Sequence, residues 1–104
     1  MNESKIKWCA EQKKGINLIE PKLHLSESYI KEADETLENV FVTKGKWKLI
    51  TAYYACYSAL YALLMKAGIK CEIHDCTFEL MELFGFNTSE IEYLRKLKED
   101  RIQV

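Results

Sequence analysis

The chain has 104 residues, with 15 basic and 16 acidic side chains and a formal net charge of −1 at pH 7. This length allows a single domain, which we place at residues 1–104. The near-neutral balance argues against a protein that binds nucleic acid through an overall basic field.

Helical segments separated by sparse turn residues account for the first half of the chain. A short helix is predicted at 3–14, followed by an extended connector at 17–24, because Pro21 disfavours helix at the residue before it. Ser26 is a suitable N-cap for an amphipathic helix of about five turns that ends near Gly45. The apolar face of that helix carries Tyr29, Ile30, Ala33, Leu37, Val40 and Phe41.

The next predicted helix, from Lys46 to Ala67, has no polar face. Its stretch 49–65 contains no charged residue, and a helix that is apolar all round must be buried all round. A chain this small can cover only part of such a helix, so we expect a homodimer that buries the rest. An alanine stripe at spacing 3, 4, 3 permits close helix approach: Ala52, Ala55, Ala59 and Ala62.

A membrane is the other environment that could bury this helix. The uncharged stretch reaches only about 25 Å, less than the roughly 30 Å of a hydrocarbon core. It also contains four tyrosines, which a spanning helix places at its ends rather than along its length. We therefore expect no membrane partner.

Two further helices complete the predicted fold. A short helix at about 75–84 ends at the sequence GFN, and Thr88 or Ser89 caps a last helix that is still in helical register at Val104. This uncapped end suggests a chain shortened relative to its relatives. The apolar side of the last helix carries Ile91, Leu94, Leu97 and Ile102. No segment alternates with period two for long enough to form a strand, so the fold class is all-α.

The N-terminal residues, MNESKIKWCAEQKKG, lack the apolar stretch of a secretory signal peptide. We therefore expect a cytoplasmic protein, and cytosolic thiols stay reduced. On this reasoning the four cysteines are free thiols rather than a disulfide framework: Cys9, Cys56, Cys71 and Cys76.

Three segments carry a resemblance to a known family: W-C-x6-I-x-L-I-x-P, then AYYACYSALYALLMKAGIKCEIHDC, then LKEDRIQV. The order of these segments is similar to that of HEPN domains (higher eukaryotes and prokaryotes nucleotide-binding), and the resemblance is strongest over residues 26–78. The resemblance implies an up-and-down four-helix bundle, here with an extra short helix, that is commonly a homodimer. It further implies a nucleotide- or RNA-binding module without a cofactor, paired with a minimal nucleotidyltransferase in a toxin–antitoxin type of system.

The resemblance does not extend to the catalytic residues of the family. HEPN ribonucleases use an arginine followed four to six residues later by a histidine on the last helix. Arg101 is the best match to that arginine and Arg95 is the alternative, but no histidine follows either one. Thr51 stands where relatives often have an arginine. We therefore expect this chain not to be an enzyme; the alternatives are a metal-independent ribonuclease or a purely structural homodimerisation module.

A ligand site, if present, is expected in a cleft between the third and last helices. It would combine His74, Arg101 and either Tyr53 or Tyr54: arginine supplies a phosphate fork, and tyrosine supplies a stacking plane. The histidine precedes Asp75, which could orient its ring. The alternative interpretation of His74 is a residue that caps or packs.

Two other clusters have alternative interpretations. Cys71, His74 and Cys76 lie within six residues and suggest a zinc site, but their spacing is unlike that of zinc fingers, and Cys9 or a second chain would have to complete the ligands. We expect no metal there. The lysines around Trp47 could hold phosphate beside a stacked base. We expect instead that Trp47 belongs to the core and that these lysines form a solvated rim: Lys44, Lys46 and Lys48.

Overall fold

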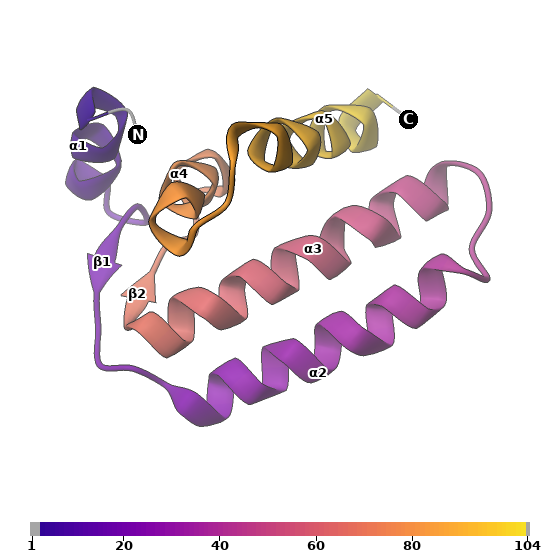
Figure 1. The fold of residues 1–104 in the computed structure, drawn as a ribbon, viewed down its shortest axis with the longest axis horizontal. Coiled ribbons are helices and arrows are strands. Elements are labelled where there is room, and N and C mark those ends of the chain that lie inside the picture. Colours follow the sequence, from indigo (N-terminus) through magenta and orange to yellow (C-terminus); the bar gives the residue numbers. More distant parts are fainter. Residues whose placement is uncertain (1–2, 104) are drawn as a thin grey trace.

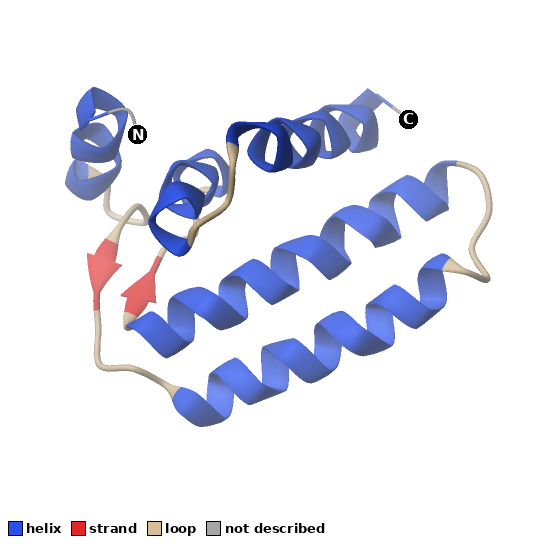
Figure 2. Ribbon diagram, in the orientation of Figure 1, coloured by secondary structure: helices blue, strands red, loops and turns tan. Residues whose placement is uncertain are grey.

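The computed structural model describes residues 3–103, with side chains described as far as Asp100 (Figure 1). Within that range the chain is helical, which confirms the all-α class. The one addition is a pair of two-residue antiparallel strands that no period-two pattern predicted (Figure 2). The elements in order are α1 (Glu3–Glu11), β1 (Asn17–Leu18), α2 (Leu23–Val40), α3 (Lys46–Ala67), β2 (Ile69–Lys70), α4 (His74–Leu80), the 3-10 helix η1 (Met81–Phe84) and α5 (Thr88–Gln103).

Helix α3 lies at the centre of the molecule. Helix α2 packs along one side of α3 as an antiparallel hairpin, and α5 packs along the other side (Figure 1). Helix α4 contacts α5, and α1 packs on α4. The helices are therefore arranged in layers about α3, and the up-and-down four-helix bundle implied by the resemblance is not confirmed.

The bounds of α3 match the prediction, and its C-terminal end shows why. Gly68 adopts a left-handed conformation with φ 82°, which only glycine adopts without strain. A Cβ at this position would also lie 2.6 Å from the carbonyl oxygen of Ile19, which approaches from the β1 side. Among the described residues, no helix is both long and apolar enough to cross a bilayer.

The start of α2 differs from the prediction. The helix begins at Leu23, so Ser26 lies in its first turn rather than at the N-cap, which is Lys22. Ser26 is buried, and its hydroxyl donates a hydrogen bond to the carbonyl oxygen of Ala62 at 2.7 Å. The serine therefore joins α2 to α3, and part of the alanine stripe is used within the chain.

The cap of α5 also differs from the prediction. Asn87, rather than Thr88 or Ser89, forms the cap: its side-chain oxygen accepts from the Glu90 amide at 2.9 Å, and the Glu90 carboxylate accepts from the Asn87 amide at 3.0 Å. Such reciprocal bonds satisfy two amides that the helix leaves unpaired. The predicted apolar side of α5 is confirmed, because Ile91, Leu94 and Leu97 are buried. The side chain of Ile102 and residue Val104 lie outside the described residues.

The expectation of free thiols is wrong for two cysteines. A disulfide joins Cys9 of α1 to Cys76 of α4, across 67 positions of sequence, while Cys56 and Cys71 stay free. The prediction failed because it assumed a reducing compartment and had no means of bringing α1 against α4. Cys9 is the buried residue of α1, so the disulfide lies where this helix meets the core.

Removing this disulfide should lower the stability of the fold. A link across so long a loop restricts the unfolded chain, which corresponds to about 3–4 kcal/mol. Denaturant unfolding with and without reductant should show that loss, and a Cys9→Ala/Cys76→Ala variant should be insensitive to reductant. Cys56→Ala, which removes a free thiol, should keep the full sensitivity. Equal stability of the native chain under both conditions would contradict the disulfide.

Candidate functional site

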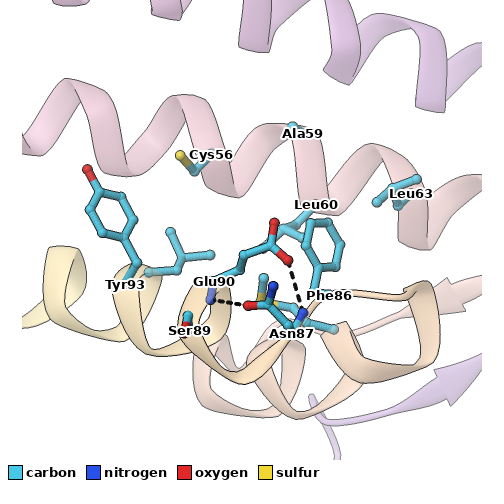
Figure 3. Close-up of a pocket in the computed structure, with 11 residues that line it drawn as sticks. Cys56, Ala59, Leu60, Leu63, Phe86, Asn87, Ser89, Glu90 and Tyr93 are labelled. Atoms are coloured by element: carbon cyan, nitrogen blue, oxygen red, sulfur yellow. Dashed lines mark hydrogen bonds between the residues drawn. The ribbon is translucent and has the colours of Figure 1, made fainter.

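A groove of about 570 Å³ runs between α3 and α5 (Figure 3). Most of its lining is apolar, and its polar residues are grouped around the start of α5. A preformed, mostly apolar hollow with a few polar groups is the usual form of a binding site. The lining residues are Cys56, Ala59, Leu60 and Leu63 from α3, Met81 and Phe86 from the connection after α4, and Asn87, Ser89, Glu90, Tyr93 and Leu94 at α5.

A second groove, of about 530 Å³, lies between α2 and α3. It is lined by Leu23, Ser26, Glu27, Ile30, Ala62, Leu63 and Lys66. Leu63 lines both grooves, so the two hollows lie on either side of this residue. The apolar face predicted for α2 is only partly covered: Ala33 is buried, whereas Ile30 and Leu37 are about half exposed. Helices α2, α3 and α5 therefore present one broad apolar face.

Cys56 is an exposed thiol on the wall of the groove between α3 and α5. Its apolar surroundings raise the pKa of the thiol by removing water from the charged form. Because the thiolate is the reactive form of cysteine, this shift makes Cys56 a poor nucleophile. The lining of this groove therefore offers mainly apolar contact.

Two of the predicted ligand residues, Tyr53 on α3 and His74 at the start of α4, are in direct contact. The hydroxyl of Tyr53 is 2.5 Å from Nδ1 of His74. The ring of Tyr57 stacks on the imidazole with centroids 3.9 Å apart, and its hydroxyl lies 3.2 Å from Oγ1 of Thr77. The imidazole is therefore held in one orientation by a hydrogen bond and a ring face.

The other predicted ligand residues are placed differently. Tyr53 is fully buried, so it can orient His74 but has no free face for a base, whereas Tyr54 beside it is 44% exposed. Arg101 belongs to the last turn of α5, and its side chain lies outside the described residues. The structure therefore brings together Tyr53 and His74, and the predicted cleft with Arg101 stays a prediction.

Ion pairs fix α1, α4 and α5 to one another beside this site. Asp75 accepts a hydrogen bond from Nζ of Lys98 at 3.0 Å, and Glu79 binds Arg95 at 2.9 Å and Lys5 at 3.7 Å. Partial burial acts to raise the pKa of Asp75, but the hydrogen bond and charge of Lys98 outweigh it and hold that pKa below its usual value. Glu79 and Arg95 are 16 positions apart, and Asp75 and Lys98 are 23 positions apart. Such separations give no signal in the sequence.

The geometry does not favour the alternative of a zinc site on Cys71, His74 and Cys76. Cys76 is bonded to Cys9, so neither sulfur is available as a thiolate, and the thiol of Cys71 lies 3.5 Å from the carbonyl oxygen of Ile73. Over the described residues, no group of three histidine, cysteine or acidic side chains is arranged to hold a metal ion.

The expected position of Trp47 in the core is also wrong. Its side chain is 59% exposed at the start of α3, and the ammonium of Lys46 lies 5.5 Å from the centre of its ring. The prediction relied on the general tendency of tryptophan to be buried. Here Trp47 lies in the first turn of α3, at the end of the hairpin, and most of its ring stays in water.

The high pKa of Tyr57 predicts a specific alkaline response. Burial raises the pKa of Tyr57 to about 12, against a smaller opposing effect of its bond to Thr77. Its contribution to stability is therefore complete below about pH 10, the ordinary tyrosine value, and is lost as the pH rises towards the folded value. The free energy of unfolding of Tyr57→Phe should fall less steeply over this range than that of the native chain. Tyr93→Phe, at an exposed ring, should follow the native chain; identical slopes for Tyr57→Phe would contradict the assignment.

Comparison with known proteins gives no further assignment. No family model matches the chain, and no curated protein or solved structure matches it. The all-α class is common to many unrelated functions. The likeness to HEPN domains therefore rests on the sequence motifs alone.

Proposed function

We propose that the chain is a HEPN-like helical module that acts through association, and that two copies pair through the apolar face of α2, α3 and α5. The observation that carries this proposal is that Leu63 on the central helix lines both grooves. Helix α3 has neighbours on two sides and stays open between them. A helix without a polar face is stable in water only when such an opening is covered.

A second copy of the chain suits this surface better than a small molecule does. The 22 residues of α3 extend over about 33 Å, and the two grooves together line its second half, from Cys56 to Lys66. A small ligand would fill one groove and leave the other in water. A two-fold interface is self-complementary, so each copy offers both a groove and a ridge. Tyr93, 66% exposed at the rim, offers a large ring of the kind that anchors protein interfaces.

Sedimentation at micromolar concentration should therefore give about 24.4 kDa, twice the 12.2 kDa of one chain. Ala59→Glu places a carboxylate on the wall of the shared face and should give a monomer, because a buried unpaired charge is strongly unfavourable. Circular dichroism should show that the variant keeps its helices. Ser28→Glu adds the same charge at an exposed position of α2 and should stay dimeric. A monomeric native chain, or a dimer indifferent to Ala59→Glu, would refute the proposal.

We infer as a second function that the dimer binds a nucleotide or an RNA phosphate near His74, in partnership with a minimal nucleotidyltransferase. The support is the fixed orientation of His74 by Tyr53 and Tyr57, with the exposed ring of Tyr54 close by. Arg101 lies one helical turn beyond Lys98, which already binds the start of α4. The near-neutral net charge gives little long-range attraction, so affinity should be modest and only slightly dependent on salt.

Chemical-shift mapping with ATP and with a short RNA tests this second function. Shifts should include His74 and Tyr54, and the affinity should fall about ten-fold or more in Arg101→Ala, because a charged hydrogen bond contributes about 1.5–3 kcal/mol. His24→Ala, which changes the other histidine, is the matched control. No shifts at millimolar ligand would leave only the homodimerisation module. RNA cleavage by the pure chain, lost in Arg101→Ala, would support the ribonuclease alternative instead.

A further inference from the structure

The loop that joins α2 to α3 exposes large apolar side chains at the end of the hairpin. Phe41 is 78% exposed, Val42 is 73% exposed and Trp47 is 59% exposed. We call residues 41–48 the hairpin tip. It lies at the end of the hairpin away from α1 and the two strands (Figure 1). A cluster of exposed apolar side chains of this kind is typical of a surface that binds a partner or a membrane.

The hairpin tip is also locally basic. Lys44, Lys46 and Lys48 alternate with Gly45 and Trp47, and no acidic residue occurs between Glu38 and Glu72. The overall charge of −1 therefore hides a stretch of sequence, residues 39–71, in which every charged side chain is basic. Three lysines around exposed apolar groups match a partner that has negative charge at its surface and an apolar layer beneath it.

We propose that the hairpin tip binds an anionic lipid surface. Phe41, Val42 and Trp47 would enter the boundary between headgroups and acyl chains, where aromatic side chains are favoured. The neighbouring lysines would bind the lipid phosphates and carboxylates, with their long stems covering apolar surface. The expectation that a membrane plays no part was derived from the length of α3, and it did not consider this loop.

An alternative partner of the same charge is single-stranded RNA, and the geometry favours lipid. Nonspecific single-strand sites combine a basic groove with successive aromatic planes on which bases stack. Val42 is among the most exposed apolar side chains of the tip, and it has no flat face for a base. One face of Trp47 already has the ammonium of Lys46 over it, 5.5 Å from the ring centre.

The expected binding is reversible and sensitive to salt. Each lysine near an anionic bilayer contributes about 1 kcal/mol, which is about a five-fold increase in affinity. Three lysines therefore correspond to about a 100-fold difference between anionic and neutral bilayers at low salt. Screening shortens the reach of these charges, so physiological salt should reduce the difference. This proposal does not depend on dimerisation or on a site at His74.

The test uses vesicles and the fluorescence of Trp47. The chain has two tryptophans, so Trp8→Phe leaves Trp47 as the single reporter. Titration with phosphatidylserine–phosphatidylcholine vesicles should shift its emission to the blue, whereas phosphatidylcholine vesicles should give far less binding. Changing the three tip lysines to glutamine should lower the affinity about 100-fold. Phe41→Ser with Val42→Ser should abolish the shift while the helices persist by circular dichroism.

A matched control separates the tip from general charge. Changing Lys7, Lys13 and Lys14 to glutamine removes the same charge from the other end of the molecule, and it should leave vesicle binding unchanged. Equal loss in the two triple variants would overturn the proposal. Absence of binding to anionic vesicles at low salt would overturn it as well. So would binding of a short single-stranded RNA through the tip lysines by a chain that ignores vesicles.

Discussion

The constraint on which this structure depends is the absence of a polar face on α3. Every side of this helix must be covered, and the other helices pack around it. Helix α2 covers one side, tied by the hydrogen bond from Ser26 to Ala62, and α5 covers the other with Ile91, Leu94 and Leu97. Among the described residues, no further element covers the opening between them. The grooves on the open side are thus a direct result of the composition of one helix.

The sequence predicted the helices well where a local rule determines them. Helix α3 ends at Gly68 because the left-handed conformation there favours glycine, and this signal is visible in the sequence. The N-cap of α5 was harder to predict, because Asn87, Thr88 and Ser89 are all good capping residues. Only the two hydrogen bonds between Asn87 and Glu90 identify Asn87 as the cap. The Cys9–Cys76 disulfide depends on how α1 packs against α4, which no local pattern encodes.

For the candidate site, too, the sequence indicated local features but not how side chains from different helices pack. Tyr53, Tyr54 and Tyr57 lie close together in the sequence on α3, and His74 lies at the start of α4. The sequence did not show that Tyr53 turns inward to the imidazole while Tyr54 turns to solvent, because both positions lie on a helix that looks apolar all round. The exposure of Trp47 was missed for a related reason: tendency to be buried is a property of a residue type, and the end of a hairpin has no neighbour to enforce it.

The disulfide divides the chain into two parts that differ in how they are held. A covalent ring closes from Cys9 to Cys76 and contains the α2–α3 hairpin and both strands, whereas most of α1, the end of α4, η1 and α5 lie outside it. The ring limits how far the hairpin can open, but α5 is held by packing and by ion pairs such as that of Lys98 with Asp75. Since α5 forms one wall of the groove along α3, this wall is joined to the covalent ring by noncovalent contacts alone, and a change in the groove's width would break no covalent bond.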